Sequence, residues 1–527
     1  MTQPVESTSP SRGNRYRAPQ DDGGILIDPP FASLLNVTKS NQRHATNANY
    51  LIAGERVADL RSSLRNYVLK ATGRVAGDNA SWFVSGHQPQ LFHPGVWFKN
   101  HLLQRLQNTY AAVGLHVIID NDLCNTNSIR VPTGSIKSPI IENVAYDDPC
   151  DWIPYEERTI QNRSLFESFG RRASDAVNSL IPAPLLRDQW HRAVRAADTN
   201  PNIGFAFSKL RQEIEAEWGS GTIELPLSRL CQRREFHLFV LHFIRHRSTF
   251  VEVYNRSLEE YRSINRIRSR SHPVPALSVT NEWCELPFWV WQTSRPRRQA
   301  LLVRASQNGI ELTDRNAVWR LPNESKTDLF LEHIAELERE GVKIRPRALM
   351  TTMFLRLLLA DLFIHGIGGA KYDELTDVIC DRLGIRLPSY VCATATLRLS
   401  VELPWGSASR IGELKQMLRE LRFHPERFIS DAGSSENQVS NWVLQKENWI
   451  RTPVLPDQRR ARHEKIAEAN SKMQHVLRGK FRELESELQL ARADRRSIDR
   501  LGSREFSFVL FPESQLRTRM QCEFPGG

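Results

Sequence analysis

The stretch SWFVSGHQPQLFHPGVWFKNHLLQRLQNTYAAVGLHVIIDND, residues 81–122, contains the pattern that decides the fold. It opens with Trp82 to Val84, a short β-rich run that ends before a loop. Apolar residues then return at helical spacing from Val96 to Gln107, and Leu115 to Ile119 is a continuous apolar run that ends in Asp120-Asn121-Asp122. A fully apolar strand is typical of a sheet covered on both faces. The order strand, loop, helix, strand therefore predicts the unit of a Rossmann-like, doubly wound α/β core.

The rest of the chain is expected to add helices and a small antiparallel meander to this core. Residues 157–268 have mostly helical spacing, and the strand-like segment from Tyr390 to Val401 indicates that the α/β core is completed late in the chain. Three β-rich runs separated by turn residues predict the meander, namely Pro275–Val279, Glu285–Gln292 and Ala300–Ala305.

The two ends of the chain differ from the middle in composition. Residues 1–25 are rich in Ser, Pro, Gly, Arg and Asp and are predicted to be disordered. The Rossmann-like core is expected to span residues 26–455. Residues 456–500 are highly charged, and their apolar residues recur at spacings of three and four, a heptad pattern with a stutter. This pattern predicts a coiled-coil helical insertion, either one arm of an antiparallel hairpin or a dimer contact, after which residues 501–527 return to the core.

The bulk properties favour a soluble cytoplasmic protein. Seven cysteines lie far apart without a CxxC pair, which favours a reducing compartment over a disulfide framework or a zinc knuckle. The N-terminus lacks the apolar run of a secretory signal. The longest apolar stretch, Ala348 to Ile367, contains Arg356 and Asp361, so a buried helix is expected and not a membrane span. The net charge of +11 fits either an anionic partner or simply a basic solvated surface.

Four separated motifs together resemble one enzyme family. The stretches SGHQPQLFHPGVWFK (85–99), DNDLCNTN (120–127) and GIGGAKY (366–372) are similar to TGQQxGLFGGPxYxxYK, DHDFxExN and GPGEIAY of the bacillithiol-biosynthesis cysteine-adding enzymes. A fourth stretch, FPESQLRTR (511–519), is similar to the family's terminal FPxxxLQER. The matching positions are Gly86, Gln88, Leu91, Phe92, Lys99, Asp120, Asp122, Asn127, Gly366, Gly368, Tyr372, Phe511, Pro512, Leu516 and Arg519.

The resemblance implies a Rossmann-type ligase-like core, a helical coiled-coil insertion and a homodimer formed through that insertion. The family activity is the condensation of cysteine with a glucosaminyl-malate acceptor. Departures from the family include His87, where the family has glutamine, Gly369, where it has glutamate, and a first loop that is two residues shorter. The LRP that precedes the third motif in the family is replaced around Met350-Thr351-Thr352. The departures leave open another substrate, or a family member that keeps the fold without the chemistry.

The candidate site residues follow from what a ligase needs. Amide formation requires an amine nucleophile, an activated carboxyl group and groups that stabilise the developing charge, and such groups collect at the carboxyl ends of parallel strands. We expect four catalytic residues at two predicted strand ends: His87, Gln88, Asp120 and Asp122. Substrate or cofactor binding is expected at Gly86, Lys99, Asn127, Gly366, Gly368, Gly369, Tyr372 and Arg519. Of these, Asn127, Tyr372 and Arg519 rest on the resemblance alone.

Local geometry refines these expectations. His87 opens a loop that leads to a helix N-terminus, a location suited to an anion. Asp120 and Asp122 project to opposite sides of a continuing strand, so at most one of them faces the substrate. The glycines of 366–369 form a loop ahead of a helix, which allows close approach of a ligand to the backbone. Without the resemblance, a tight connection between helices is the favoured interpretation of these glycines.

No cofactor has a decisive sequence motif. ATP with Mg²⁺ is compatible with a ligase, but the chain lacks the Walker A sequence GxxxxGK[ST]. No resident metal is expected: His242 and His246 have zinc-ligand spacing, but apolar residues between them indicate a packed helix. The alternative function is that of a basic nucleic-acid-binding or scaffold protein, with arginine clusters at 262–270 and 459–462. Neighbouring glutamates dilute these clusters, so a small-molecule substrate is favoured and nucleic acid is not.

Overall fold

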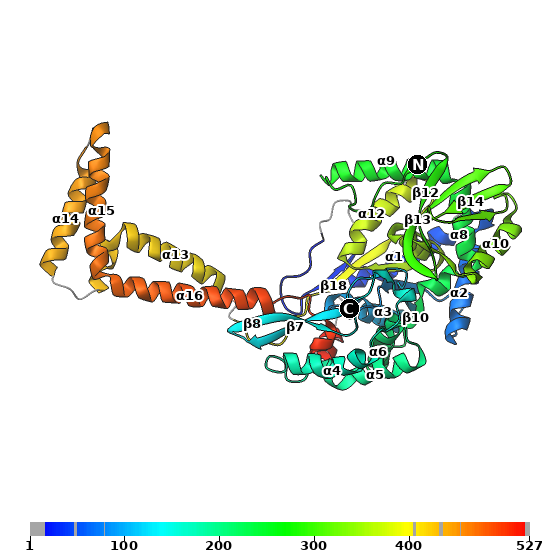
Figure 1. Cartoon of the computed structure of the whole chain (residues 1–527), viewed down its shortest axis with the longest axis horizontal. Helices are drawn as coiled ribbons and strands as arrows, with labels where there is room; N and C mark the ends of the chain where they lie inside the picture. Colours follow the sequence, from blue (N-terminus) through cyan, green and yellow to red (C-terminus); the bar gives the residue numbers. More distant parts are fainter. Residues whose placement is uncertain are drawn as a thin grey trace. The chain divides into compact units, whose positions relative to one another are not determined.

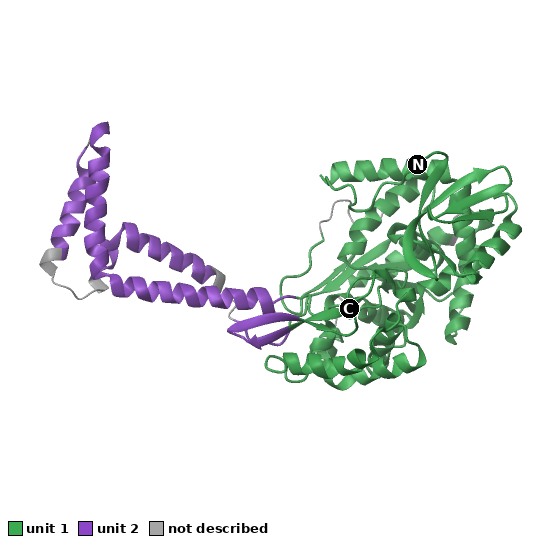
Figure 2. Cartoon of the chain, in the orientation of Figure 1, with its two compact units in different colours: residues 1–131, 143–398, 504–527 green, residues 132–142, 399–503 purple. Residues whose placement is uncertain are grey.

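The computed structural model describes residues 16–46, 50–77, 79–403, 407–431, 436–453 and 455–521. The chain divides into two compact units (Figure 2). Unit 1 comprises residues 1–131, 143–398 and 504–527, and unit 2 comprises residues 132–142 and 399–503. The predicted disorder of residues 1–15 lies outside the described residues. Residues 16–25 differ from that prediction, because Tyr16 is buried and the Gly23 amide donates to the Thr396 carbonyl at 2.8 Å.

Unit 1 is built around a six-stranded, mostly parallel sheet, so the protein belongs to the α/β class. The strand order is β1-β18-β17-β4-β5-β10, and β1 alone is antiparallel to its neighbour. The predicted unit of strand, helix and strand is present as β4 (Trp82–His87), α3 (Pro94–Tyr110) and β5 (Val113–Ile118). The other strands are β1 (Ile25–Asp28), β10 (Ile223–Pro226), β17 (Leu362–His365) and β18 (Tyr390–Ala395).

Helices cover both faces of this sheet, which explains why its strands are apolar throughout. On one side, Trp82 and Val84 pack in the core with residues of α2 (Val57–Thr72), α8 (Arg234–Arg245) and α11 (Ala348–Leu358). Helix α3 packs against β4, β5, β17 and β18, and α12 (Ile367–Arg382) packs against β17 and β18. Helix α1 (Leu34–Thr46) follows the edge strand β1 and contacts β17.

The predicted helical region between β5 and the meander is mostly helical. It contains α4 (Arg163–Val177), α5 (Leu185–Thr199) and α6 (Ile203–Glu217), which lie side by side (Figure 1). The long amphipathic stretch that follows is divided into α7 (Leu227–Cys231), α8 and α9 (Arg247–Ile264). Strand β10 interrupts this region and adds the last strand to the central sheet.

The predicted meander is present but larger than expected. Its strands are β11 (Val279–Thr280), β12 (Trp283–Gln292), β13 (Arg295–Ser306), β14 (Gly309–Thr313) and β15 (Val318–Leu321), all antiparallel. Helix α10 (Thr327–Arg339) then leads to β16 (Val342–Pro346), which pairs with the other side of β12. The remaining strands form three two-stranded sheets: β2 (Leu51–Ile52) with β3 (Glu55–Arg56), β6 (Leu123–Cys124) with β9 (Ile153–Pro154), and β7 (Ser128–Ser135) with β8 (Ser138–Ala145).

Unit 2 contains residues 132–142 of the β7–β8 pair and a helical segment that begins earlier than the predicted boundary at 456. Its helices are α13 (Ser407–Phe423), α14 (Glu436–Arg451), α15 (Arg459–Val476) and α16 (Arg478–Leu501). Helix α13 packs along α16 and α14 packs along α15 (Figure 1), with Leu414, Leu421, Leu484 and Leu488 buried in the first of these pairs. The heptad segment is therefore two helices, each paired with an earlier helix of the same chain. Dimerisation through it stays a prediction.

The apolar stretch with internal charges forms α11 and the start of β17. Both charges are buried and paired, Arg356 with Asp373 and Asp361 with Arg61. None of the helices within the described ranges combines the length and apolarity that crossing a membrane requires.

Candidate active site

A cavity of about 650 Å³ lies at the carboxyl ends of β4 and β17 in unit 1. From β4 the chain proceeds to β5 on one side, whereas β17 and β18 are added later on the other side. The gap between β4 and β17 is thus the topological switch point of the sheet, where α/β proteins bind their ligands. The last residues of both strands, His87 and His365, line the cavity together with the first turns of α3 and α12.

Lys99 of α3 is a buried cation in the wall of this cavity. Its Nζ donates to the Gly86 carbonyl at 2.8 Å, and the side chain pairs with no carboxylate among the described residues. Burial lowers the pKa of Lys99 to about 8. Since an ammonium group is costly to bury without a counter-charge, this position is suited to an anionic ligand.

His87 lies beside Lys99 and is neutral at pH 7. Its Nδ1 lies 3.2 Å from the Gln88 carbonyl oxygen, which can only accept, so Nδ1 carries the hydrogen. Burial, with the charge of Lys99 nearby, lowers the pKa of His87 to about 3. The ring packs edge-on against Phe92. His87 can therefore act on a ligand as a neutral hydrogen-bonding group and does not contribute a positive charge.

The structure brings His365 into the site, a residue that the sequence analysis did not single out. His365 Nε2 lies 2.7 Å from Asp373 Oδ2, and Arg356 Nη1 reaches the same oxygen at 2.7 Å. Burial alone would raise the pKa of Asp373, but Arg356 and His365 hold that pKa below its ordinary value. The ionised carboxylate only accepts, so Nε2 carries the hydrogen and Nδ1 is left with a lone pair. Burial lowers the pKa of His365, so the ring is neutral at pH 7.

The glycines of the third motif form the first turn of α12 and not a loop ahead of it. The helix begins at Ile367, and Gly366 caps it without a side-chain hydrogen bond. A Cβ at Gly369 would lie 2.5 Å from His365 Nδ1, whereas a Cβ at Gly368 would meet nothing within 4 Å. The glycine at 369, where the resembling family has glutamate, is thus required by the ring of His365.

Two further cations come from the meander sheet and the segment after it. The guanidinium carbons of Arg298 and Arg347 lie 4.8 Å and 4.2 Å from the ring centroid of Trp289. Arg504 lines the opposite part of the cavity and donates to Thr394 Oγ1 at 2.9 Å. With Lys99, four cations line the cavity, against two carboxylates, Asp122 and Glu505. The lining itself has an excess of positive charge, and one of its cations, Arg347, is balanced by Glu285 at 2.8 Å.

The two predicted strand-end loops meet in this cavity. Gln88 Nε2 donates to Asp122 Oδ2 at 2.7 Å, and Arg298 Nη1 binds Asp122 Oδ1 at 3.0 Å. Asp120 points to the other side, as alternation along an extended segment predicts. Its carboxylate accepts from the Ser228 amide at 3.0 Å and from the Ser228 hydroxyl at 2.5 Å. Burial, together with the charge of Glu156, raises the pKa of Asp120 to about 7.

The remaining predicted residues divide into two groups. Gly86 and Tyr372 line the cavity, as do Gly366, Gly368 and Gly369. Asn127 and Arg519 do not, and neither does Asp120. Asn127 Nδ2 donates to the Asp147 carbonyl at 3.0 Å and holds a turn, and Arg519 pairs with Asp22 at 3.7 Å. These three residues were predicted from the spacing within the motifs. Spacing gives the position of a residue along the chain but not the direction in which its side chain points.

The donors in the cavity fit an anion better than a metal. Asp122 is already engaged by Gln88 and Arg298, and no group of three or more His, Cys, Asp or Glu side chains within the described ranges is placed to hold a metal ion. The histidine pair that has zinc-ligand spacing is also committed, because both ring nitrogens of His242 bond within the fold, to Tyr50 and to the Ala53 amide.

Comparison with known proteins adds no identification. No protein-family model matches the chain, and no curated protein matches its sequence. The resemblance to the cysteine-adding enzymes therefore rests on the four motifs alone.

Proposed function

We propose that this chain is an enzyme that joins an amine to an anionic acceptor, a carboxylate or sugar acid, in the cavity between β4 and β17. The observation that carries the proposal is Lys99, a buried ammonium group without a carboxylate partner among the described residues, at the switch point of the sheet. The resemblance to the cysteine-adding ligases agrees with this reaction class and suggests cysteine as the amine.

The acceptor would bind where positive charge and unpaired backbone amides converge. The first turn of α12 has no side-chain cap, so its amides are available to an anion, and the helix dipole favours negative charge there. Lys99 supplies the counter-charge in the wall of the cavity, whereas the nearby Arg347 is paired with Glu285 at 2.8 Å. The same groups would stabilise negative charge that develops on the acyl oxygen when the amine attacks.

His365 is the group best suited to accept a proton from the amine. An ammonium group must lose a proton before its nitrogen can attack, and a neutral imidazole is a suitable base near pH 7. Asp373 holds the His365 ring with Nδ1 as the free acceptor. In the proposed step the amine nitrogen bonds to the activated acyl carbon, its proton passes to Nδ1, and the activating group leaves with its bonding electron pair. Asp373 is in this account a positioning residue.

ATP with Mg²⁺ is proposed as the activating cofactor. Its phosphates fit the cationic lining, and ATP would supply the activation of the acceptor carboxyl group. Both carboxylates of the lining face an arginine, Asp122 with Arg298 and Glu505 with Arg504, so the ion would be held largely through the phosphates, as is usual for Mg²⁺. The proposal places the enzyme in the cytoplasm, where the six unpaired cysteines within the described residues would stay reduced.

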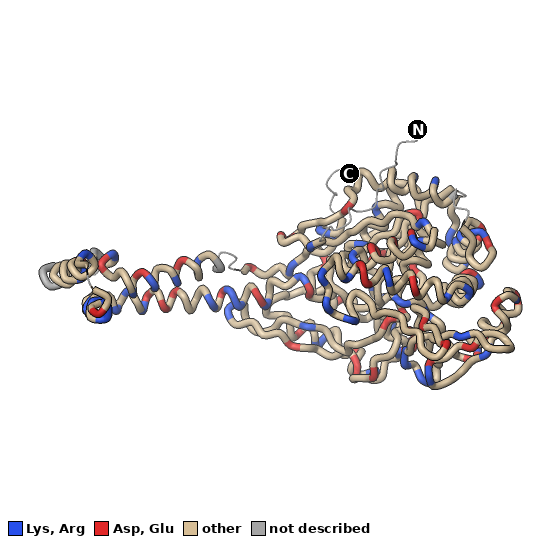
Figure 3. Tube along the Cα trace, turned by 90° about the horizontal axis from the view of Figure 1, so that it is seen from above, with Lys and Arg blue, Asp and Glu red and all other residues tan. Residues whose placement is uncertain are grey.

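Nucleic-acid binding is the second candidate and is disfavoured by the charge pattern of unit 2. Cations and carboxylates are interspersed in the sequences of α15 and α16, and Figure 3 shows both colours recurring along the helices of unit 2. Many form pairs one helical turn apart, including Arg460–Glu464, Lys472–Glu468, Lys480–Glu483 and Arg495–Asp499. Such pairing leaves little continuous positive surface for a phosphate backbone.

Ligand binding by the full-length chain tests the two candidates. Calorimetric titrations with pyrophosphate, ATP with Mg²⁺, cysteine, a sugar acid and duplex DNA would be compared for the wild type and Lys99→Met. Arg105→Met, at an exposed arginine outside the cavity, is the matched control. We expect an anion to bind the wild type and the control equally and Lys99→Met about tenfold more weakly. Anion binding that ignores Lys99→Met, or binding of DNA alone, contradicts the proposal.

A further inference from the structure

A loop rich in arginine borders the cavity between β4 and β17. Residues 262–272, with the sequence RSINRIRSRSH, begin in the last turn of α9 and contain four arginines and no carboxylate. The next three residues, Pro273 to Pro275, line the cavity. The ring of His272 packs against Tyr372 of α12, with 5.9 Å between the ring centroids, and Tyr372 also lines the cavity. The loop therefore lies at the rim of the proposed active site.

Arg262 holds this loop in place. Its side chain is half-buried, its Nε donates to the His272 carbonyl at 3.0 Å, and its Nη2 donates to the carbonyls of Arg270 and Val274, each at 2.6 Å. The Tyr261 hydroxyl donates to a backbone carbonyl of α12 at 2.9 Å, and α9 packs against α12 (Figure 1). Because the backbone of the loop is ordered in this way, a ligand that binds its side chains does not have to order it first.

Three further arginines of the loop are exposed and form no ion pair or side-chain hydrogen bond with any residue that the structure describes, namely Arg266, Arg268 and Arg270. They occupy every second position, so the first and the last are at most about 13 Å apart along an extended chain. Guanidinium groups are planar donors that bind the oxygens of a phosphate group in pairs. The loop is long enough for one or two phosphate groups, whereas nucleic-acid-binding proteins commonly contact about 6–10 of them.

Neighbouring charges leave the positive charge of the loop largely uncompensated. Residues 256–275 contain two glutamates and no aspartate. Glu260 is engaged by one arginine of α9 and by one of α12, which leaves Glu259 as the one carboxylate of this segment that can offset the three exposed arginines. On α12, Glu374 lies near Lys371, so these two charges offset each other. A positive surplus therefore remains at the rim of the cavity.

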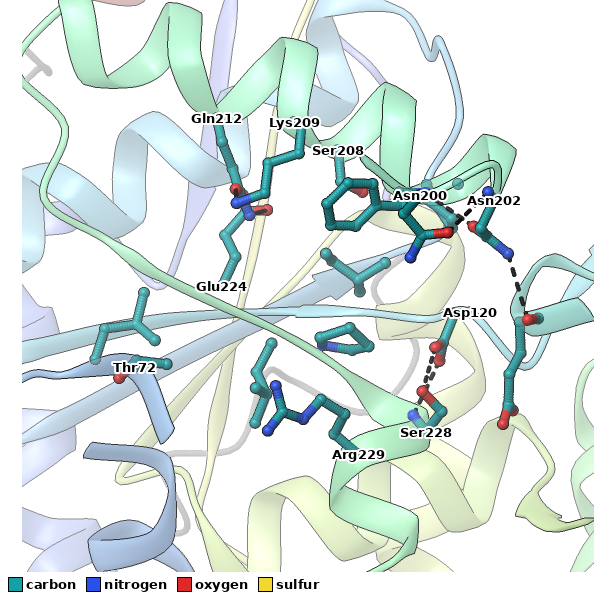
Figure 4. Close-up of a pocket in the computed structure, with 18 of the residues that line it drawn as sticks. Thr72, Asp120, Asn200, Asn202, Ser208, Lys209, Gln212, Glu224, Ser228 and Arg229 are labelled. Carbon is teal, nitrogen blue, oxygen red and sulfur yellow. Dashed lines mark hydrogen bonds between the residues drawn. The ribbon is translucent and has the colours of Figure 1, made fainter. Parts of the chain in front are cut away.

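Such a surplus is not a general property of the cavities of unit 1. A second cavity, of about 920 Å³, lies along β10 (Figure 4), and five carboxylates line it against three cations. Figure 4 shows Asp120 and Glu224 among the carboxylates, and Lys209 and Arg229 among the cations. An anionic ligand is therefore expected at the cavity between β4 and β17 and not along β10.

We propose that the acceptor carries a phosphate group at the end remote from its reacting carboxyl group, and that Arg266, Arg268 and Arg270 bind this phosphate at the rim of the cavity. This site rests on the ligase reaction proposed above, because the carboxyl end of the acceptor is taken to lie at Lys99. Binding of the remote phosphate would hold the acceptor in place for the reaction and would select it over sugar acids that lack the phosphate. The triphosphate of ATP shares this chemistry and is the alternative source of the phosphate group.

Calorimetric titrations of the full-length chain with gluconate and with 6-phosphogluconate test this site, because the two sugar acids differ by one phosphate group remote from the carboxyl group. We expect the wild type to bind 6-phosphogluconate about tenfold more tightly than gluconate, and the triple variant Arg266→Gln, Arg268→Gln, Arg270→Gln to reduce this ratio to about two. The triple variant Arg105→Gln, Arg130→Gln, Arg419→Gln is the matched control. It removes the same charge at exposed arginines outside the cavity and should keep the ratio of the wild type. Absence of the gain in the wild type, or an equal gain in the loop variant, overturns the proposal.

Lys99→Met separates the phosphate site from the proposed reaction. Loss of the Lys99 charge should weaken the binding of both sugar acids equally and leave their ratio near that of the wild type, because Lys99 acts on the carboxyl end. If Lys99→Met weakens neither, the proposed function fails. If it weakens both while the loop variant keeps the ratio of the wild type, only the phosphate site is refuted. A parallel titration with ATP covers the alternative source: a loop variant that binds ATP more weakly but keeps the sugar-acid ratio overturns the assignment of the loop to the acceptor.

Discussion

At the residue scale, a side chain at position 369 would occupy space that the His365 ring already fills. A Cβ at 369 would lie 2.5 Å from His365 Nδ1, a distance at which the ring or the helix has to move. We expect Gly369→Ala to lower the free energy of unfolding by about 1–3 kcal/mol, as overpacked substitutions do, measured by urea denaturation. Gly368→Ala in the same turn meets nothing within 4 Å and should be neutral or raise it by about 0.5–1 kcal/mol.

The pairing with His365 makes this prediction specific. In the background His365→Ala, the further change Gly369→Ala should cost far less than it does in the wild type, because the ring that it meets is gone. An equal cost in both backgrounds would show that the helix backbone, and not His365, resists the methyl group.

The lowered pKa of His87 leads to a second prediction, which concerns how the free energy of unfolding depends on pH. Its pKa is lowered from 6.5 to about 3 in the folded chain, chiefly by burial. Between these values the unfolded chain binds a proton that the folded chain does not, so stability is lost as the pH falls below 6.5. His87→Gln removes this loss. The drop in unfolding free energy from pH 7 to about pH 4.5 should be roughly 2 kcal/mol smaller in His87→Gln than in the wild type. Equal drops would place His87 in a solvated environment.

Single residues also show how much of the site the sequence could predict. His87, Gln88, Lys99 and Asp122 were expected together because they follow two strands that the apolar pattern identifies, and all four line one cavity. Arg298 and Arg347 could not be found in this way, since they come from distant segments that only tertiary packing brings to the same place. His365 carried a local signal, an imidazole directly after an apolar run and before the glycines, which the motif comparison did not use.

At the scale of elements, Asp361 connects α2 to the start of the strands that carry the site. It binds Arg61 Nη2 at 2.7 Å and Arg65 Nη2 at 2.9 Å, and it accepts from the Trp82 amide at 2.8 Å. The same two arginines also bond carbonyls near the end of α11. We expect Asp361→Asn to lower the unfolding free energy by about 3–5 kcal/mol, because it leaves two buried guanidinium groups without their carboxylate.

The matched control for this prediction is Asp59, an exposed carboxylate on α2, the helix that carries Arg61 and Arg65. Asp59 pairs with Arg56 at 2.7 Å, and both side chains are more than half exposed. Exposed pairs contribute about 0–1 kcal/mol, so Asp59→Asn should change stability little in the same urea titration. A loss of similar size in both variants would mean that the Asp361 cluster is no more than an ordinary surface pair.

Helices and strands were predicted best where the length of an apolar segment and the spacing of its apolar residues both indicate the same type of element. The pattern of β4, α3 and β5 is continuous, and the meander has turn residues between its β-rich runs. Strand β10 was missed because its four residues, Ile-Glu-Leu-Pro, lie between helices and are too short for periodicity to separate from a helix end. The glycines of 366–369 were not expected inside a helix because glycine is a helix breaker, whereas here the space taken by His365 requires glycine at position 369 in the first turn of α12.

At the scale of the whole molecule, the sequence predicts the α/β class and a helical insertion but not where the insertion begins. The heptad pattern is visible in α15 and α16, whereas their partners α13 and α14 have shorter apolar stripes and were assigned to the core. Pairing with α16 makes α13 part of unit 2, and only the tertiary contacts reveal that relation. The excess of positive charge in the cavity is likewise a property of the folded chain, because its four cations lie in widely separated segments.

Because the chain divides into two compact units, we expect a destabilising substitution in the core of unit 2 to leave the stability of unit 1 unchanged. Leu484 is 1% exposed in the core between α13 and α16, so Leu484→Ala should cost about 2–5 kcal/mol. We expect hydrogen exchange to become faster in α13 and α16, while β4 and β5 keep their protection and the anion titration of unit 1 is unchanged. Leu490→Ala on the same helix, 64% exposed, should alter neither. Faster exchange in β4 and β5 after Leu484→Ala would instead mean that the two units unfold as one cooperative body, since a local cavity reaches distant strands only through shared stability.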